Sequence, residues 1–154
     1  MRIRNATLDD FEALKRFKIL SKKEEMKYSE TLKPLEHTKE KYLDYLKTDL
    51  TRQWRAIFVA AEDDKIIGMV LGKRYNTISI SKYKKKGYIS NLYVDKEYRK
   101  KGIGGKLILH TLKWLKKQGV PHITVEVHIK NSAAQNLYRK LGFNDYTIKL
   151  TKNI

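Results

Sequence analysis

YRKKGIGGK, at residues 98–106, follows an apolar segment that ends at Val94 and precedes an amphipathic segment that runs to Lys117. Three glycines after a basic cluster, between a predicted strand and a predicted helix, are typical of a backbone loop that holds a phosphate. Glycines lack the Cβ atoms that would keep an anion away, and a helix N-terminus offers unpaired N–H groups and the positive end of its dipole. Positive side chains in that first turn oppose the dipole unless an anion is bound there. The alternative interpretation is a lysine-rich chain whose glycines only form a turn.

The composition indicates a single domain over residues 1–154 with a strong positive charge. Lys and Arg number 34 against 17 Asp and Glu, which gives a net charge of +17. Such a field attracts polyanions and anionic small molecules without saying which of them binds. The chain has no Cys, and its four His form no recognisable metal set, so we expect no metal site. We also expect a cytoplasmic protein that does not interact with membranes, because no segment resembles a signal peptide or is long enough to cross a bilayer.

Hydrophobic periodicity predicts a mixed α/β protein. Strands are expected at residues 3–6, 56–61, 66–71, 88–94, 123–129 and 146–150. Helices are expected after Thr7, over residues 38–50 and 103–117, and after Asn131 or Ser132 as far as Gly142. Residues 76–86 read as a lysine-rich polar loop, and residues 21–36 do not decide between a broken helical turn and a loop. This order of elements predicts helices packed on a central sheet.

Two motifs lie between residues 88 and 143. The first is Arg99, two residues, Gly102, one residue and Gly104, preceded by the Leu92-Tyr93-Val94 strand. The second contains Asn131, Ala134, Leu137-Tyr138 and Leu141-Gly142-Phe143. The first motif alone is moderately specific, and the two motifs at this spacing are highly specific. On these residues the chain resembles the GNAT family of acetyl-CoA-dependent N-acetyltransferases, and the order of the preceding elements also matches.

The resemblance implies a GNAT fold, in which a mixed, mostly antiparallel sheet carries helices on both faces and its two middle strands splay apart. The pantetheine arm of acetyl-CoA would lie between the strands at 88–94 and 123–129, and its pyrophosphate would rest on amides of the glycine loop. The cofactor-binding residues that the resemblance implies are Leu92, Tyr93, Val94, Arg99, Lys100, Lys101, Gly102, Ile103, Gly104, Gly105, Lys106, Asn131, Ala134 and Tyr138. Asn131 has a second interpretation as a helix cap, which is sufficient by itself.

The implied reaction is direct transfer of the acetyl group from acetyl-CoA to a primary amine. It requires a neutral amine, a polarised carbonyl and a proton for the leaving thiolate. The resemblance places Tyr138 near the sulfur as the general acid, and its ring could pack in the core while its hydroxyl reaches the cleft. Glu126 is the candidate base, acting through a water, because the resemblance to the branch that acetylates protein N-termini implies a glutamate there. The alternative for Glu126 is a solvated or salt-bridged side chain.

The acceptor amine is left open between a protein N-terminus, a lysine side chain, a polyamine and an aminoglycoside. Residues 144–154 lack the tyrosine-rich, acidic pattern that protein N-terminal acetyltransferases often show after their Gly-Phe, which weakens the peptide interpretation. Met26, Tyr28 and Trp54 could line the acceptor site or simply pack.

Two other functions compete with catalysis. One is a GNAT-like domain that senses acetyl-CoA without turnover, although the chain keeps both Tyr138 and the glycine loop. The other is a basic module that binds nucleic acid, which ranks far behind because no helix-turn-helix, zinc or single-strand platform motif is visible. Dimers are common among relatives, so the resemblance leaves a homodimer open.

Overall fold

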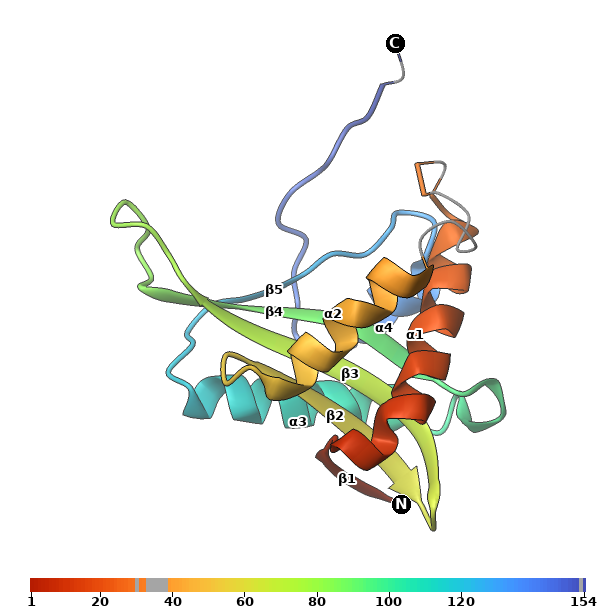
Figure 1. Cartoon of the computed structure of the whole chain (residues 1–154). Helices are drawn as coiled ribbons and strands as arrows, with labels where there is room; N and C mark the ends of the chain where they lie inside the picture. Colours follow the sequence, from red (N-terminus) through yellow and green to blue (C-terminus); the bar gives the residue numbers. More distant parts are fainter. Residues whose placement is uncertain (30, 33–38, 153) are drawn as a thin grey trace.

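The computed structural model describes residues 1–29, 31–32, 39–152 and 154. Within them, five strands form one sheet in the order β1-β2-β3-β4-β5, with helices on both faces (Figure 1). The strands are β1 (Arg2–Asn5), β2 (Arg55–Glu62), β3 (Lys65–Asn76), β4 (Lys85–Val94) and β5 (Ile123–Val125). The helices are α1 (Phe11–Met26), α2 (Lys39–Thr51), α3 (Ile103–Lys117) and α4 (Ser132–Lys140), with short 3-10 turns at Leu8–Asp10 and Lys96–Tyr98. This arrangement confirms the predicted mixed sheet with helices on both faces.

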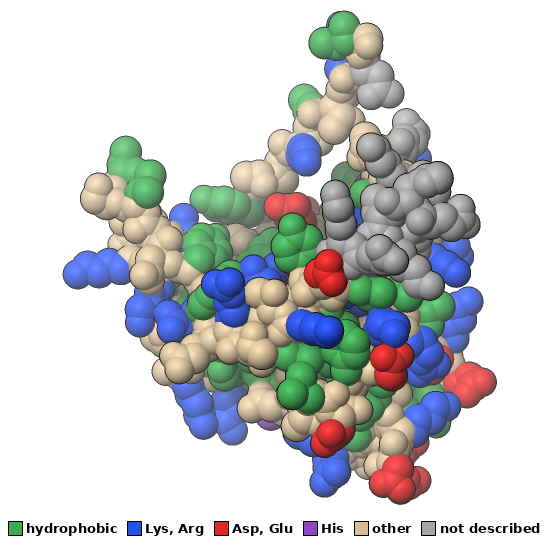
Figure 2. Space-filling view, in the orientation of Figure 1, with side chains coloured by type: hydrophobic (Ala, Val, Ile, Leu, Met, Phe, Trp, Pro, Cys, Tyr) green, Lys and Arg blue, Asp and Glu red, His purple; other side chains and the backbone are tan. Residues whose placement is uncertain are grey.

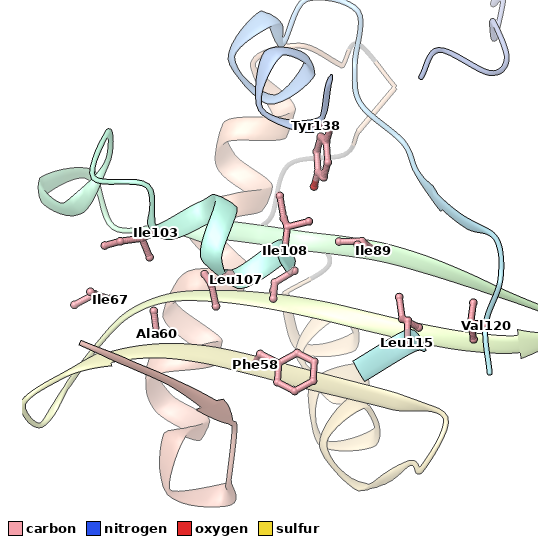
Figure 3. Packing of buried hydrophobic residues seen from close by; sticks show 11 residues of the cluster. Phe58, Ala60, Ile67, Ile89, Ile103, Leu107, Ile108, Leu115, Val120 and Tyr138 are labelled. Atoms are coloured by element: carbon pink, nitrogen blue, oxygen red, sulfur yellow. The ribbon is translucent and has the colours of Figure 1, made fainter. Parts of the chain in front are cut away.

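Two hydrophobic cores lie on opposite faces of the sheet, because successive side chains of a strand point to opposite faces. Phe58, Val70 and Ile89 belong to the core beneath α3 and α4. Val59 and Met69 belong to the core beneath α1 and α2. The buried stripe of α3, which includes Leu107 and Ile108, lies against the first of these cores (Figure 3). The alternation also sends the neighbours of Ile89 on β4 toward the α1 side of the sheet.

The sheet opens between β4 and β5. The first three strand pairs are antiparallel, whereas β4 and β5 are parallel and pair only from Gly87–Ile89 to Ile123–Val125. β4 continues to Val94, and a register shift against β3 coincides with Asn91 at φ +52°. Such a bulge bends a strand and increases its twist. Beyond Ile89, no strand in the described part of the chain pairs with β4 on its β5 side. This divergence is the predicted splay.

Several element boundaries differ from the predictions. β5 ends at Val125 instead of residue 129, because β4 diverges from it and no other described strand flanks it. The strand expected at 146–150 is wrong: these residues form no strand, and Tyr146, Ile148 and Leu150 are 78%, 88% and 88% exposed. Alternating side chains alone do not hold a strand that has no partner for its backbone.

The helical and hairpin regions are longer than the periodicity suggested. α1 continues through Met26, so the first part of the undecided segment at 21–36 is helical. β3 and β4 extend into the expected polar loop until Asn76 pairs with Lys85. Half of the rest of the undecided segment, residues 30 and 33–36, lies outside the described residues, as does Thr38 at the expected start of α2. None of the described helices is long and apolar enough to cross a bilayer.

Candidate active site

The glycine loop enters α3 through two residues in the left-handed conformation, Lys100 at φ +62° and Gly102 at φ +75°. Gly102 caps the helix, and the N–H of Lys106 donates to its carbonyl oxygen at 3.1 Å. The amides of residues 103–105 therefore form the first turn, whose N–H groups have no acceptor within a helix. A Cβ at Gly102 would meet nothing within 4 Å. The loop thus offers donors and space to an anion, as its sequence predicted.

The basic side chains of the loop divide into two groups. Lys100, Lys101 and Lys106 are exposed around the loop, and the first turn of α3 contains no acidic residue. Arg99 instead turns toward α1 and β4. Its guanidinium donates to Glu24 at 2.8 Å and to the Val94 carbonyl at 2.9 Å, and it lies 5.1 Å from the centre of the Tyr93 ring. The three loop lysines are therefore exposed around the glycine loop, whereas the Arg99 side chain connects the loop to α1.

The open edge of β4, the glycine loop and α4 converge at Gly104. A Cβ built there would lie 3.4 Å from Leu137 of α4, 3.8 Å from Leu92 and 3.9 Å from Val94. Tyr93 points to the other face, where its ring centre lies 5.3 Å from that of Phe17. Unpaired backbone groups along a strand edge can pair with an extended chain that carries amides. These features fit acetyl-CoA, with its pyrophosphate at the loop and its amide-bearing arm along β4.

The Tyr138 side chain extends from α4, and its hydroxyl points toward β4 (Figure 3). α4 begins at Asn131, whose side chain accepts a hydrogen bond from the Ala134 N–H at 3.1 Å, so the cap interpretation of Asn131 is confirmed. Tyr138 is 7% exposed and packs edge-on against Phe143, with ring centres 5.4 Å apart. Burial raises the pKa of the Tyr138 hydroxyl above its usual value of 10.0, and neighbouring Tyr88 adds to the shift. The group therefore stays protonated and able to donate a proton.

Tyr88 connects the two predicted catalytic residues and was missed in the sequence. Burial raises the pKa of Tyr88, and the charges of Glu126 and Glu25 raise it further. Tyr88 in turn contributes to the raised pKa of Tyr138. The charges of two carboxylates, from α1 and from the segment after β5, therefore act on Tyr88 of β4, which interacts electrostatically with Tyr138 of α4. The sequence pattern that could have revealed Tyr88 is the alternation along β4. Tyr88 and Ser90 flank the buried Ile89, so their side chains must point to the opposite face of the sheet.

The residues predicted as candidates to line the acceptor site lie in different parts of the structure. Tyr28, which follows α1, stacks on His128 with ring centres 5.7 Å apart, so it lies across the segment that carries Glu126. Trp54 instead lies beneath the guanidinium of Arg55, 4.0 Å from its ring centre. The described residues contain no group of three or more His, Cys, Asp or Glu side chains arranged to hold a metal ion.

The comparisons with known proteins agree with this geometry. The profile of the acetyltransferase (GNAT) family matches residues 20–143. N-alpha-acetyltransferase 30 of Schizosaccharomyces pombe is 36% identical over 112 residues, which cover 70% of each chain. The N-alpha-acetyltransferase of Sulfurisphaera tokodaii is 30% identical over 153 residues, which cover 96% of this chain and 82% of the relative.

A solved structure shares the whole fold. The crystal structure of a predicted acetyltransferase with acetyl-CoA from Clostridium acetobutylicum aligns with a TM-score of 0.80. The alignment covers 99% of this chain and 95% of that one at 20% identity. The family match includes the glycine loop, the splayed strands and Tyr138, and we conclude that this chain belongs to the GNAT family of N-acetyltransferases, which transfer the acetyl group of acetyl-CoA to an amine.

Proposed function

We propose that this protein acetylates the α-amino group at the N-terminus of a peptide or protein, with Tyr138 as general acid and Glu126 as general base. The placement of Tyr138, which is buried on α4 with its hydroxyl toward β4 at the splay, carries this proposal, and the charge of Glu126 acts on Tyr88, which in turn acts on Tyr138. The names of the two N-alpha-acetyltransferases described above also indicate transfer to α-amino groups, which favours this acceptor over polyamines and aminoglycosides.

The donor would be held by backbone more than by side chains. The first-turn amides of residues 103–105 would bind the pyrophosphate, with Lys100, Lys101 and Lys106 neutralising its charge. The β4 edge at 92–94 would pair with the amides of the pantetheine arm. Asn131 and Ala134 at the start of α4 would border the thioester end, with Tyr138 in the same helix near the sulfur.

The acceptor would approach from the α1 side of the sheet. A net charge of +17 repels an ammonium group at long range, so a cationic acceptor needs local carboxylates. Glu25 and Glu126 supply them beside Tyr88. An α-amino group has a pKa of about 8, so it deprotonates readily near neutral pH, and Glu126 would accept its proton through a water.

The chemical step then needs no covalent enzyme intermediate. The neutral nitrogen attacks the thioester carbonyl carbon, and the C–N bond forms while the carbonyl becomes an oxyanion and the nitrogen becomes positively charged. The nitrogen then loses its extra proton to solvent water. This intermediate collapses as the C–S bond breaks, and Tyr138 donates its proton to the leaving thiolate. The products are the N-acetylated peptide and the thiol of CoA, and solvent returns Tyr138 and Glu126 to their starting protonation states.

Thiol release from acetyl-CoA tests the proposal with three acceptor pools: lysine-free peptides with a free N-terminus, N-blocked peptides with one lysine, and spermidine. We expect turnover with the first pool. Tyr138→Phe should reduce kcat by about 10²-fold or more, the range for loss of a general acid, with little change in the KM for acetyl-CoA. Tyr45→Phe, at a 63% exposed position on α2, is the matched control. Turnover with spermidine alone would contradict the acceptor, and acetyl-CoA binding without any turnover would indicate a sensing domain.

A further inference from the structure

A second hollow, called here the loop pocket, opens at the foot of the β3–β4 loop with a volume of about 690 Å³. Aromatic side chains form part of its wall. Tyr83 stacks on His122 with ring centres 5.3 Å apart and an interplanar angle of 13°, and Tyr146 meets the edge of His122 at 5.8 Å. The pocket therefore joins the β3–β4 loop, the residue before β5 and the segment after α4.

The loop that borders this pocket presents apolar side chains to solvent. Ile78 and Ile80 are 76% and 87% exposed, and both line the pocket. Hydrophobic side chains gather on the projecting loop and around its foot (Figure 2). Exposed apolar side chains around a hollow indicate a surface that another molecule covers.

The loop pocket lies on the same face of the sheet as Tyr88. Tyr75 pairs with Lys86, and the N–H of Gly87 donates to the carbonyl of His122 at 2.8 Å, so these strands present Tyr75, Lys86 and His122 in one row. The next row contains Lys73, Tyr88 and Thr124. Tyr75 also contributes to the raised pKa of Tyr88, which shows that the two rows are neighbours. The pocket therefore lies one row of side chains away from Tyr88 on this face.

The strand spacing gives the distance from the reactive amine. His122 and Glu126 are four residues apart along the same extended segment, which corresponds to roughly 13 Å at 3.3 Å per residue. An extended peptide with its amine near Glu126 covers the same distance in about four residues.

We propose that the loop pocket binds the acceptor chain itself, around its fourth to sixth residues, and selects an apolar side chain flanked by carboxylates. This inference rests on the proposed N-terminal acetylation. Ile80 and Tyr83 supply the apolar wall, while Lys82 and Lys86 supply positive charge at the pocket. None of the described lining residues is acidic, so the charge of the pocket is complementary to that of an acidic peptide.

Acceptor length and sequence test this assignment. Peptides of three, six and ten residues would share their first three residues, and the longer ones would carry Glu-Leu-Glu, Lys-Leu-Lys or Gly-Ser-Gly at positions 4–6. We expect kcat/KM to rise about tenfold from three to six residues for Glu-Leu-Glu only, and to change little from six to ten.

Two double variants test whether the loop pocket is responsible for this gain in kcat/KM. Ile78→Ser combined with Ile80→Ser, and separately Lys82→Gln combined with Lys86→Gln, should remove most of the tenfold gain while the three-residue peptide reacts at the wild-type rate. The matched controls are Leu109→Ser, at a 54% exposed position on α3, and Lys116→Gln at the end of α3. They should keep the gain.

Other results would overturn the inference. Equal kcat/KM for all lengths in the wild type would show that the pocket does not read the acceptor. Self-association of the protein that the isoleucine variant abolishes, with no effect of peptide length, would assign the pocket to a second copy. If no peptide is acetylated at all, the proposed function fails. Fluorescence anisotropy of the labelled Glu-Leu-Glu ten-residue peptide then tests separately whether the loop pocket binds it. Equal affinity of wild type and isoleucine variant in that experiment would overturn it.

Discussion

The guanidinium of Arg99 donates to the carboxylate of Glu24 at 2.8 Å and thereby joins the glycine loop to a helix 75 residues earlier. A second ion pair, between Arg16 and Asp95 at 3.2 Å, connects α1 to the same β4–α3 connection. The turn of α1 that carries Glu24 also carries Glu25, whose charge acts on Tyr88. One turn of α1 therefore binds the glycine loop through Glu24 and acts on Tyr88 through the charge of Glu25.

Glu24→Gln should raise the KM for acetyl-CoA at low ionic strength by no more than about fivefold, since a half-exposed ion pair is worth about 0–1 kcal/mol. The difference should shrink at high salt, where the pair is screened in the wild type. Steady-state kinetics at two salt concentrations measures it. Glu12→Gln, which breaks the exposed pair with Lys15, is the control. An unchanged KM at low salt would show that the pair does not position the loop.

A comparison of Gly102→Ala with Gly119→Ala distinguishes the effect of backbone strain on stability from an effect on acetyl-CoA binding. The two glycines have similar φ values, +75° and +71°, so the strain in the two variants should be similar. An alanine held in the left-handed region costs about 1–2 kcal/mol, so both variants should lose similar stability in denaturant titrations. Only Gly102→Ala should raise the KM for acetyl-CoA severalfold, because it alone lies in the loop. Equal KM values for both variants would exclude a role of this turn in donor binding.

The pH profile of kcat should rise as the bound acceptor amine deprotonates near pH ~8 and then remain level to pH 10. The pKa of Tyr138 lies above 10.0, so the general acid keeps its proton through this range. Initial rates from pH 6 to pH 10 measure the profile. A falling limb that begins below pH 9.5 would mean that another group, with an ordinary pKa, supplies the proton to the thiolate.

Lys18 makes stability depend on pH in the alkaline range. Its side chain is 4% exposed and lies 3.6 Å from Asp49, and burial followed by the charges of Lys73 and Arg55 lowers the pKa of Lys18 to about 8. Between pH 8 and the unfolded value of about 10.4, the unfolded chain binds more protons at this site, so its contribution to stability rises with pH.

Comparison with Lys18→Met isolates that contribution from the other titrating groups. Methionine retains most of the apolar stem without the charge, while Arg55 still pairs with Asp49. We expect the stability of the wild type relative to Lys18→Met to increase from pH 7.5 to pH 10 in urea titrations. A constant difference across this range would contradict the lowered pKa.

Substitutions at Asn131 distinguish the helix cap from a contact with acetyl-CoA. Asn131→Ala should lower the free energy of unfolding by about 1 kcal/mol, because the Ala134 N–H loses its acceptor, whereas Asn131→Asp should keep the cap. If the side chain only caps α4, the aspartate variant keeps the wild-type KM for acetyl-CoA. A raised KM for acetyl-CoA in both variants would show that the Asn131 side chain also contacts acetyl-CoA.

The sequence alone was enough wherever the signal is local. A glycine after a basic cluster, an N-cap three residues before Ala134 and the stripe of α3 depend on neighbours within one or two turns, so their placement agreed with the structure. The strand at 146–150 failed for the opposite reason. A strand is stabilised by a partner, and the alternation of Tyr146, Ile148 and Leu150 says nothing about whether a partner edge is adjacent.

By itself, the sequence determined the family, the order of elements as far as α4 and the identity of the glycine loop, because these follow from periodicity and from residues at short fixed spacings. Only the tertiary structure decided that Arg99 turns to α1, that Tyr88 interacts electrostatically with both Glu126 and Tyr138, and that the β3–β4 loop forms a pocket with His122. Each of these contacts joins segments tens of residues apart. They depend on strand register and on the divergence of β4 from β5, which arise from packing of the whole sheet.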